Sequence, residues 1–169
     1  MTVFTAENCI IRDNVSFWGA GIFFSPQFNS SLRLNACVFE NNLSSNSAAF
    51  YALPATGTTM NVRVTNSLFN GNRSEDDTSM GRTGLGSPAG WIRAFFDNSK
   101  TNVTLVNNTF VNNSVQATGA NTDYPVLGIS KSTTNIELSD FNISNNIFWG
   151  NTANGATASA IGRVVDILP

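Results

Sequence analysis

The sequence predicts an all-β fold: a single-stranded parallel β-helix (β-solenoid) of about five coils with two lateral loop insertions. Three features of the 169 residues predict it: a motif present five times, apolar–polar alternation before each copy, and a small residue followed by a large one after it. A unit of about 28 residues cannot bury its own apolar face, so it must lie on the next unit. Because one pattern runs from end to end, we expect a single domain, 1–169, that is a segment of a longer assembly or a protomer in one.

The repeated motif reads N-x-x-F-x-x-N. Its copies are NCIIRDN (8–14), ACVFENN (36–42), NSLFNGN (66–72), NNTFVNN (107–113) and NNIFWGN (145–151). The closing column is asparagine in every copy: Asn14, Asn42, Asn72, Asn113 and Asn151. The central column holds Ile11, Phe39, Phe69, Phe110 and Phe148, and the opening column holds Asn8, Ala36, Asn66, Asn107 and Asn145. Coils that stack about 4.8 Å apart would place each column in register.

Asparagine suits the bends of such a stack because its side-chain amide can bond both the backbone of the turn and the asparagines above and below. We therefore expect both asparagine columns to form inner ladders, with Asn107 inaccessible and Asn66→Ala costing about 1–3 kcal/mol. The central column is expected to be a buried aromatic stack. Trp149, which follows Phe148, is expected to face water.

The flanking segments complete each coil. Before each copy of the motif, apolar residues alternate with polar ones, which indicates a strand with one buried face. These apolar pairs are Leu32/Leu34, Val62/Val64, Val103/Leu105 and Phe141/Ile143. The small-large pairs after the motif are Gly21-Ile22, Ala49-Phe50, Gly90-Trp91, Gly128-Ile129 and Ala160-Ile161. Trp91 is therefore expected to pack in the same column as Ile22 and Phe50.

The composition argues against several classes of partner. Charged residues make up 12% of the chain, about half the usual share. The net charge of −2 gives no electrostatic footprint for nucleic acid and does not favour acidic membranes. No apolar run approaches the roughly 20 residues that span a bilayer, and the first residues lack the features of a signal peptide. We expect no nucleic-acid partner and no membrane insertion.

The two cysteines, Cys9 and Cys37, fall in one column of adjacent coils. Their α-carbons are expected about 5 Å apart, which is within disulfide range. A disulfide would fit an exported protein, whereas two free, buried thiols are the alternative. The mass of the unreduced protein distinguishes the two states.

Four stretches carry a resemblance to a known family: Phe39-Glu-Asn-Asn42, Phe69-Asn-Gly-Asn72, Phe110-Val-Asn-Asn113 and Phe148-Trp-Gly-Asn151. They match the FxxN element of polymorphic outer-membrane-protein repeats, and Gly19-Ala-Gly-Ile22 resembles the partner element GGA[ILV] of those repeats. The resemblance covers nearly all of the chain. It implies a right-handed parallel β-helix of the pectate-lyase-like superfold, as in the passenger domains of surface adhesins.

The sequence shows no catalytic constellation. The chain has no histidine, so the commonest general base is absent, and its 11 acidic residues are scattered among different columns. There is also no nucleophile elbow, phosphate loop or spacing typical of metal ligands. We therefore expect a non-enzymatic protein without a cofactor, although a polysaccharide-active enzyme remains an alternative for this superfold.

Two insertions, 73–88 and 114–125, leave the same edge of adjacent coils and are expected to lie side by side. Insertions on one face of a repeat stack often carry binding sites. We expect either a ligand, glycan or partner-subunit site there, or a solvated protrusion. Calcium could bind through Asp76, Asp77 and Asp123. The candidate binding residues are Arg73, Glu75, Asp76, Asp77, Arg82, Asp123 and Tyr124.

Four N-x-S/T sites are expected to be accessible for glycosylation because they fall at turns, loop edges or outward strand positions. These candidates are Asn29, Asn102, Asn112 and Asn142.

The strand pattern starts by Val3 and runs to Val165 without a capping helix, so both terminal coils are expected to be covered by copies of the chain or by further coils. The sequence thus predicts an extracellular or cell-surface structural or adhesive module that can stack end to end into a fibre. The alternative is a carbohydrate-binding or degenerate carbohydrate-active β-helix that uses the two insertions. In that case Trp18, Trp149 or Tyr124 would serve as sugar platforms.

Overall fold

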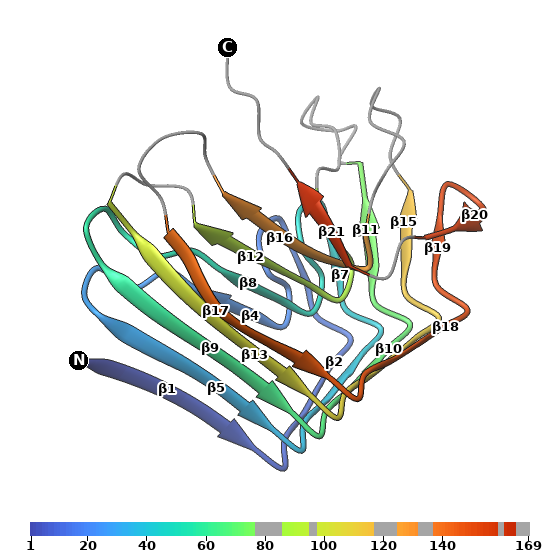
Figure 1. Ribbon diagram of the computed structural model, residues 1–169. Coiled ribbons are helices and arrows are strands. Elements are labelled where there is room, and N and C mark those ends of the chain that lie inside the picture. The colour runs from blue at the N-terminus through green and yellow to red at the C-terminus, as the bar shows by residue number, and fades with distance from the viewer. Residues whose placement is uncertain (77–85, 95–97, 117–124, 132–136, 159–160, 165–169) are drawn as a thin grey trace.

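The computed structural model describes residues 1–76, 86–94, 98–116, 125–131, 137–158 and 161–164 (Figure 1). These residues form β-strands, turns and bends, and none of them lies in a helix. Over the same ranges, no helix is therefore long and apolar enough to cross a bilayer. The strands are arranged in four sheets, three of five strands and one of six.

Each sheet gathers one strand from every turn of the chain. Sheet one contains β1 (Thr2–Glu7), β5 (Ser30–Asn35), β9 (Thr59–Thr65), β13 (Lys100–Val106) and β17 (Glu137–Ser144). Sheet two contains β2 (Ile10–Arg12), β6 (Val38–Glu40), β10 (Leu68–Asn70), β14 (Thr109–Val111) and β18 (Ile147–Trp149). Sheet three contains β3 (Val15–Ser16), β7 (Leu43–Ser44), β11 (Arg73–Glu75), β15 (Ser114–Gln116), β19 (Thr152–Ala153) and β20 (Ala156–Thr157). Sheet four contains β4 (Ile22–Phe24), β8 (Phe50–Ala52), β12 (Gly90–Ala94), β16 (Leu127–Lys131) and β21 (Ile161–Val164).

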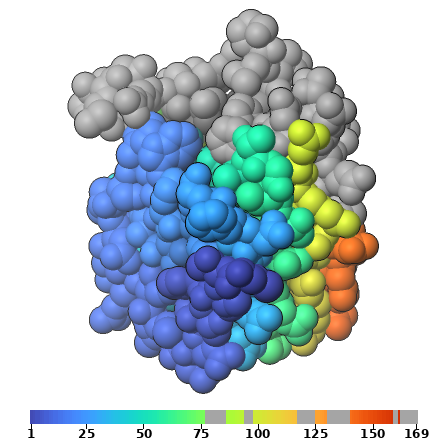
Figure 2. All heavy atoms as spheres, turned by 90° about the vertical axis from the view of Figure 1, so that its left-hand side faces the viewer, coloured from blue at the N-terminus to red at the C-terminus, as the bar shows by residue number. Residues whose placement is uncertain are grey.

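The chain visits the four sheets in the same order five times, and we call each such passage a coil. Paired strands are parallel, apart from β19 and β20 at the end of sheet three. In Figure 2 the colour changes from blue through green and yellow to orange across one face, so successive coils lie next to one another in sequence order. The predicted all-β class and the stacking of parallel strands are confirmed.

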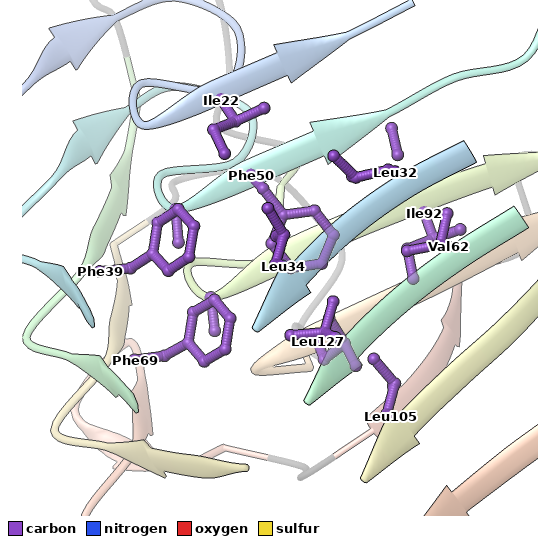
Figure 3. Packing of buried hydrophobic residues seen from close by; sticks show 14 of the residues in the cluster. Ile22, Leu32, Leu34, Phe39, Phe50, Val62, Phe69, Ile92, Leu105 and Leu127 are labelled. Atoms are coloured by element: carbon purple, nitrogen blue, oxygen red, sulfur yellow. The ribbon is translucent and has the colours of Figure 1, made fainter. Parts of the chain in front are cut away.

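The central column of the motif forms a continuous stack of aromatic rings inside the coils. Phe39 and Phe69 lie 4.9 Å apart between ring centroids with an interplanar angle of 3°, and Figure 3 shows one ring above the other. The stack continues from Phe69 to Phe110 at 4.7 Å and from Phe110 to Phe148 at 4.5 Å. Phe39, Phe69 and Phe110 are fully buried, whereas Ile11 and Phe148 in the terminal coils are half-buried. The predicted aromatic column is confirmed.

The apolar residues of sheet one cover the other side of the same interior. Leu32, Leu34, Val62, Val64, Val103 and Leu105 are at most 1% exposed, as the alternation predicts. The fourth predicted pair, Phe141/Ile143, is 46% and 39% exposed because β17 is the edge strand of the sheet. The six buried residues belong to one cluster with the aromatic stack and with Phe50, Ile92 and Leu127 of sheet four. The core therefore runs along the stack of coils without a break.

The predicted place of Trp91 is wrong, although the side chain is buried as expected. Trp91 pairs with Tyr51, one position beyond Phe50, and its ring contacts the Tyr51 ring at 5.7 Å. The reason lies at Gly90, where an added Cβ would come within 2.3 Å of the Phe50 ring. The Phe50 ring therefore fills the space of a side chain at position 90, and the next residue points to the opposite face. The pair Gly128-Ile129 is displaced in the same way, because Gly128 pairs with Trp91.

The aromatic stack generates a stability prediction. We expect Phe69→Ala to lower the free energy of unfolding by about 3–5 kcal/mol, because it removes a buried ring between two others. The exposed ring of Phe28 provides the control, and Phe28→Ala is expected to change stability by about 0.5 kcal/mol or less. Denaturant unfolding of the two variants measures both values. Equal effects would contradict the assignment of Phe69 to the core.

Candidate functional site

The closing asparagines are joined by hydrogen bonds along the whole stack. The Nδ2 atom of each donates to the Oδ1 atom of the asparagine in the next coil: Asn14 to Asn42 at 2.9 Å, Asn42 to Asn72 at 2.9 Å, Asn72 to Asn113 at 3.0 Å, and Asn113 to Asn151 at 3.0 Å. The last four side chains are at most 5% exposed. This is the ladder that the sequence predicts for the closing column.

Each amide in the ladder also satisfies the backbone of the coil before it. Nδ2 of Asn72 donates to the carbonyl oxygen of Phe39 at 2.9 Å, and Nδ2 of Asn113 donates to that of Phe69 at 2.9 Å. The backbone N–H of Asn72 donates to Oδ1 of Asn113 at 3.0 Å. One asparagine thus pairs several polar groups that the bend buries.

The ladder has a direction. Every Oδ1 atom that accepts does so from the preceding coil, and the Nδ2 atoms of the first four asparagines donate to the following one. Within the described residues, Oδ1 of Asn14 therefore has no donor, and Asn151 has no following asparagine to donate to. Asn14 is exposed, so its Oδ1 is open to an added donor, whereas Asn151 is 5% exposed and lies beside the hairpin of β19 and β20.

The opening column does not form the inner ladder expected for it. Asn8, Asn66, Asn107 and Asn145 are exposed turn residues with positive φ, between 52° and 58°. Asn66 donates to Asn35 at 3.0 Å and Asn107 donates to Asn66 at 3.3 Å, so their bonds lie at the surface. Asparagine is favoured here because it tolerates the left-handed conformation. The expectation that Asn107 is inaccessible is therefore wrong.

The buried position is the next residue in the chain. Nδ2 of Asn108 donates to Oδ1 of Asn146 at 3.0 Å, and the backbone N–H of Ser67 donates to Oδ1 of Asn108 at 3.0 Å. Cys9 and Cys37 occupy this position in the first two coils. Two coils have asparagine at both positions, Asn107-Asn108 and Asn145-Asn146, so the motif did not distinguish them. At this second position the first three coils have Cys9, Cys37 and Ser67 in place of asparagine. A second asparagine ladder can therefore join only the last two coils.

The two cysteines are in register, as the sequence predicts. The neighbouring residues Ile10 and Val38 pair, and the N–H of Val38 donates to the carbonyl oxygen of Cys9 at 2.8 Å. Both residues are free thiols in the structure. Cys37 is buried, its thiol donates to the carbonyl oxygen of Ala6 at 3.3 Å, and burial raises its pKa. A disulfide between them stays a prediction.

The predicted insertions begin later than the sequence indicates. Residues 73–75 form β11 and residues 114–116 form β15, and these strands pair in register. Arg73 and Glu75 form an ion pair on β11. The N–H of Asp76 donates to the carbonyl oxygen of Gln116 at 3.1 Å, so the two insertions leave the sheet next to each other. Asp77, Arg82, Asp123 and Tyr124 lie outside the described residues.

The part of the chain that the structure describes contains no group of three or more Asp, Glu, Cys or His residues that could hold a metal ion. Of the residues expected to bind calcium, only Asp76 falls in that part.

The glycosylation candidates lie at the surface to different degrees. Asn29, Asn112 and Asn142 are exposed, whereas Asn102 is half-buried and its Nδ2 donates to Asn61 at 2.7 Å. Oδ1 of Asn29 accepts a bond from the N–H of Thr59 at 2.8 Å. Oδ1 of Asn142 likewise accepts a bond, from Oγ of Ser144 at 3.3 Å, so Asn29, Asn112 and Asn142 are the exposed acceptors and Asn102 is the less accessible one.

The aromatic residues considered as sugar platforms differ in their surroundings. Trp18 is 41% exposed and packs against Tyr51 with 5.3 Å between ring centroids. Trp149 is 75% exposed on the terminal strand β18, so it faces water as expected. Tyr124 lies outside the described residues. Trp18 therefore has a buried aromatic support.

A comparison of the chain with protein families, curated proteins and solved structures finds no match.

The closing ladder generates a paired prediction. Asn72→Ala leaves several buried groups without partners, each worth about 1–3 kcal/mol, so we expect a loss of about 3 kcal/mol in unfolding free energy. Asn66→Ala removes only surface bonds, and Ala36 already occupies that turn position with a φ of 51°, so about 1 kcal/mol is expected. Chemical denaturation of both variants provides the comparison. A larger loss for Asn66→Ala would contradict the assignment of the buried ladder to the closing column.

Proposed function

We propose that the four sheets are the walls of one right-handed parallel β-helix. Support comes from the constant order of the chain, since each coil passes from sheet one to sheet four and the next coil begins on the adjacent strand of sheet one. Connections between parallel strands are right-handed in about 98% of cases, which favours that hand for the coils. The resemblance of the FxxN stretches to polymorphic outer-membrane-protein repeats points the same way.

For function, we propose a non-enzymatic extracellular structural or adhesive module whose ends are covered by further coils. One observation carries this proposal. An interior column of sheet one runs through Phe4, Leu32, Val62, Val103 and Phe141. The three middle residues are at most 1% exposed, but Phe4 is 41% exposed and Phe141 is 46% exposed. The apolar interior therefore opens to water at both ends.

The polarity of the asparagine ladder favours one way of covering those ends. The donor of Asn151 can pair with an acceptor such as Oδ1 of Asn14 only if the added coil continues in the same direction and β20, which pairs with β19 at that edge of sheet three, gives way. Head-to-tail contacts generate open filaments unless their rotation closes them into a ring, and stacking along the direction of the coils favours the filament. A further coil can come from additional repeats of the polypeptide or from a second copy of this chain.

The surface chemistry is compatible with an exported module. Only 12% of the residues are charged, and the turns are rich in asparagine, serine and threonine. Asn112 and Asn142 offer exposed acceptors for glycans. The chain has no histidine, which disfavours general acid–base catalysis at neutral pH.

The stacking proposal is tested with the purified chain by negative-stain electron microscopy and sedimentation. We expect rods or concentration-dependent oligomers. Phe4→Lys is expected to weaken association, because it places a charge at the open interior column. Phe28→Lys is the matched control, since Phe28 is 72% exposed outside that column and its replacement should leave association unchanged. A monodisperse monomer at high concentration would overturn end-to-end stacking.

A second candidate is carbohydrate binding by the two insertions. The observation that favours it is the hydrogen bond from Asp76 to Gln116, which sets the stems of the insertions next to each other. A deletion of 77–85, with a glycine-serine linker in its place, retains the residues of strand β11 and the buried residues 86–89. We expect glycan-array binding to disappear in that deletion and to persist in Phe28→Lys. Binding that survives the deletion would exclude this edge as the glycan site.

A further inference from the structure

Two arginines lie next to each other on the outer face of sheet one. Arg33 of β5 pairs in register with Arg63 of β9, and both side chains are exposed. Adjacent strands are about 4.8 Å apart, so the two side chains leave neighbouring points of the sheet. Like charges directly opposite each other destabilise a sheet. The chain has only 9 Lys and Arg residues, and two of them are placed opposite each other in adjacent strands.

Within the described residues, no carboxylate forms an ion pair with either arginine, although Glu7 lines a groove that both arginines border. The ion pairs in this part of the chain join Arg12 to Asp13 and Arg73 to Glu75. Thr5 and Thr104 occupy the same column in the strands on either side, and neither carries a charge. The pair therefore presents two guanidinium groups to solvent.

The arginine pair borders a groove of about 570 Å³ at the end of sheet one. The groove is also lined by the amides of Asn35, Asn66 and Asn107, with Val106 among its apolar residues. Glu7 is the acidic residue in the lining, and it pairs in the sheet with Asn35, not with an arginine. The size falls within the range of about 300–1,000 Å³ that is typical of ligand sites.

A second hollow of about 240 Å³ lies along the same arginines. Ser31, Asn61 and Asn102 contribute polar groups to it. Arg33 and Arg63 line both hollows, so the positive charge lies between two surfaces rich in amides and hydroxyls. An extended ligand that crosses the arginine pair could contact both.

We infer that this face binds an anionic oligosaccharide, through carboxylate or sulfate groups on Arg33 and Arg63. A guanidinium group can bind two oxygens of a planar carboxylate or of a tetrahedral sulfate, and it forms strong charge-assisted hydrogen bonds with either. Amide side chains both donate and accept hydrogen bonds, as sugar hydroxyls do. A nucleic acid is disfavoured because the net charge of the chain is −2. This site is on a different face from the insertion edge and does not depend on end-to-end stacking.

The experiment is calorimetric titration of the full chain at low salt with three probes: a hyaluronan hexasaccharide, a heparin-derived hexasaccharide and the neutral cellohexaose. We expect at least one charged probe to bind and cellohexaose not to bind. The two charged probes separate carboxylate from sulfate recognition. A single-stranded oligonucleotide of similar charge is included, and we expect it to bind at least roughly tenfold more weakly than the preferred sugar.

Arg63→Ala is expected to weaken binding of the preferred sugar roughly tenfold, and the Arg33→Ala/Arg63→Ala double variant further. Arg12→Ala is the matched control, because it removes one exposed positive charge from sheet two, and it should change the dissociation constant less than roughly twofold. Arg63→Lys should bind with intermediate affinity, because lysine keeps the charge but not the bidentate geometry.

The thermal melting temperature separates loss of the site from loss of the fold. The double variant is expected to melt no lower than the original protein, since it relieves a like-charge contact. Three results would each overturn the inference: no binding of either charged sugar, an equal loss in Arg12→Ala, or equal binding of the oligonucleotide. Filament formation is measured separately, so stacking and sugar binding can fail independently.

Discussion

The structure depends on the hydrogen bonding of the closing asparagines. At the bend between sheets two and three, backbone N–H and carbonyl groups are buried away from water. In the three middle coils, Asn42, Asn72 and Asn113 each donate to the carbonyl of the central-column residue in the preceding coil and to the next asparagine, so those bends are satisfied. The ring of Phe69 can then be buried against Phe39 and Phe110 without leaving polar groups unpaired. The apolar core and the polar ladder therefore stabilise the same stacking geometry.

A regular interior leaves the variable chemistry to the surface. The interior column of sheet one becomes exposed in the terminal coils, at Phe4 and Phe141. The insertion edge departs from β11 and β15, and the arginine pair lies on the outer face of sheet one. These three regions do not overlap, so we regard assembly, loop-mediated recognition and anion binding as separable properties of one scaffold. Because the asparagine ladder has a direction, assembly through the ends would also have a direction.

Columns with one residue type in every coil could be predicted, because a parallel stack places equal motif positions beside one another. This holds for Phe39, Phe69 and Phe110. The prediction for the opening column was wrong because both an exposed left-handed turn and a buried ladder favour asparagine. In Asn107-Asn108 the first residue is the turn residue and the second is the ladder residue. The predicted column of Trp91 was wrong because the Phe50 ring occupies the space at Gly90. This contact joins two coils, and neither local sequence indicates it.

The repeat alone was enough to derive the all-β class, the register of the motif and the buried aromatic column, since these follow from periodicity and from the need to bury apolar side chains. Other features required the folded chain. Arg33 and Arg63 stand between the aligned pairs Leu32/Leu34 and Val62/Val64, so the repeat already places them in one column, but the grooves beside them appear only in the folded chain. The direction of the asparagine ladder likewise depends on which atom of each amide faces the next coil. Contacts between side chains of adjacent coils depend on how the folded chain places those side chains, so they cannot be derived from the residue types alone.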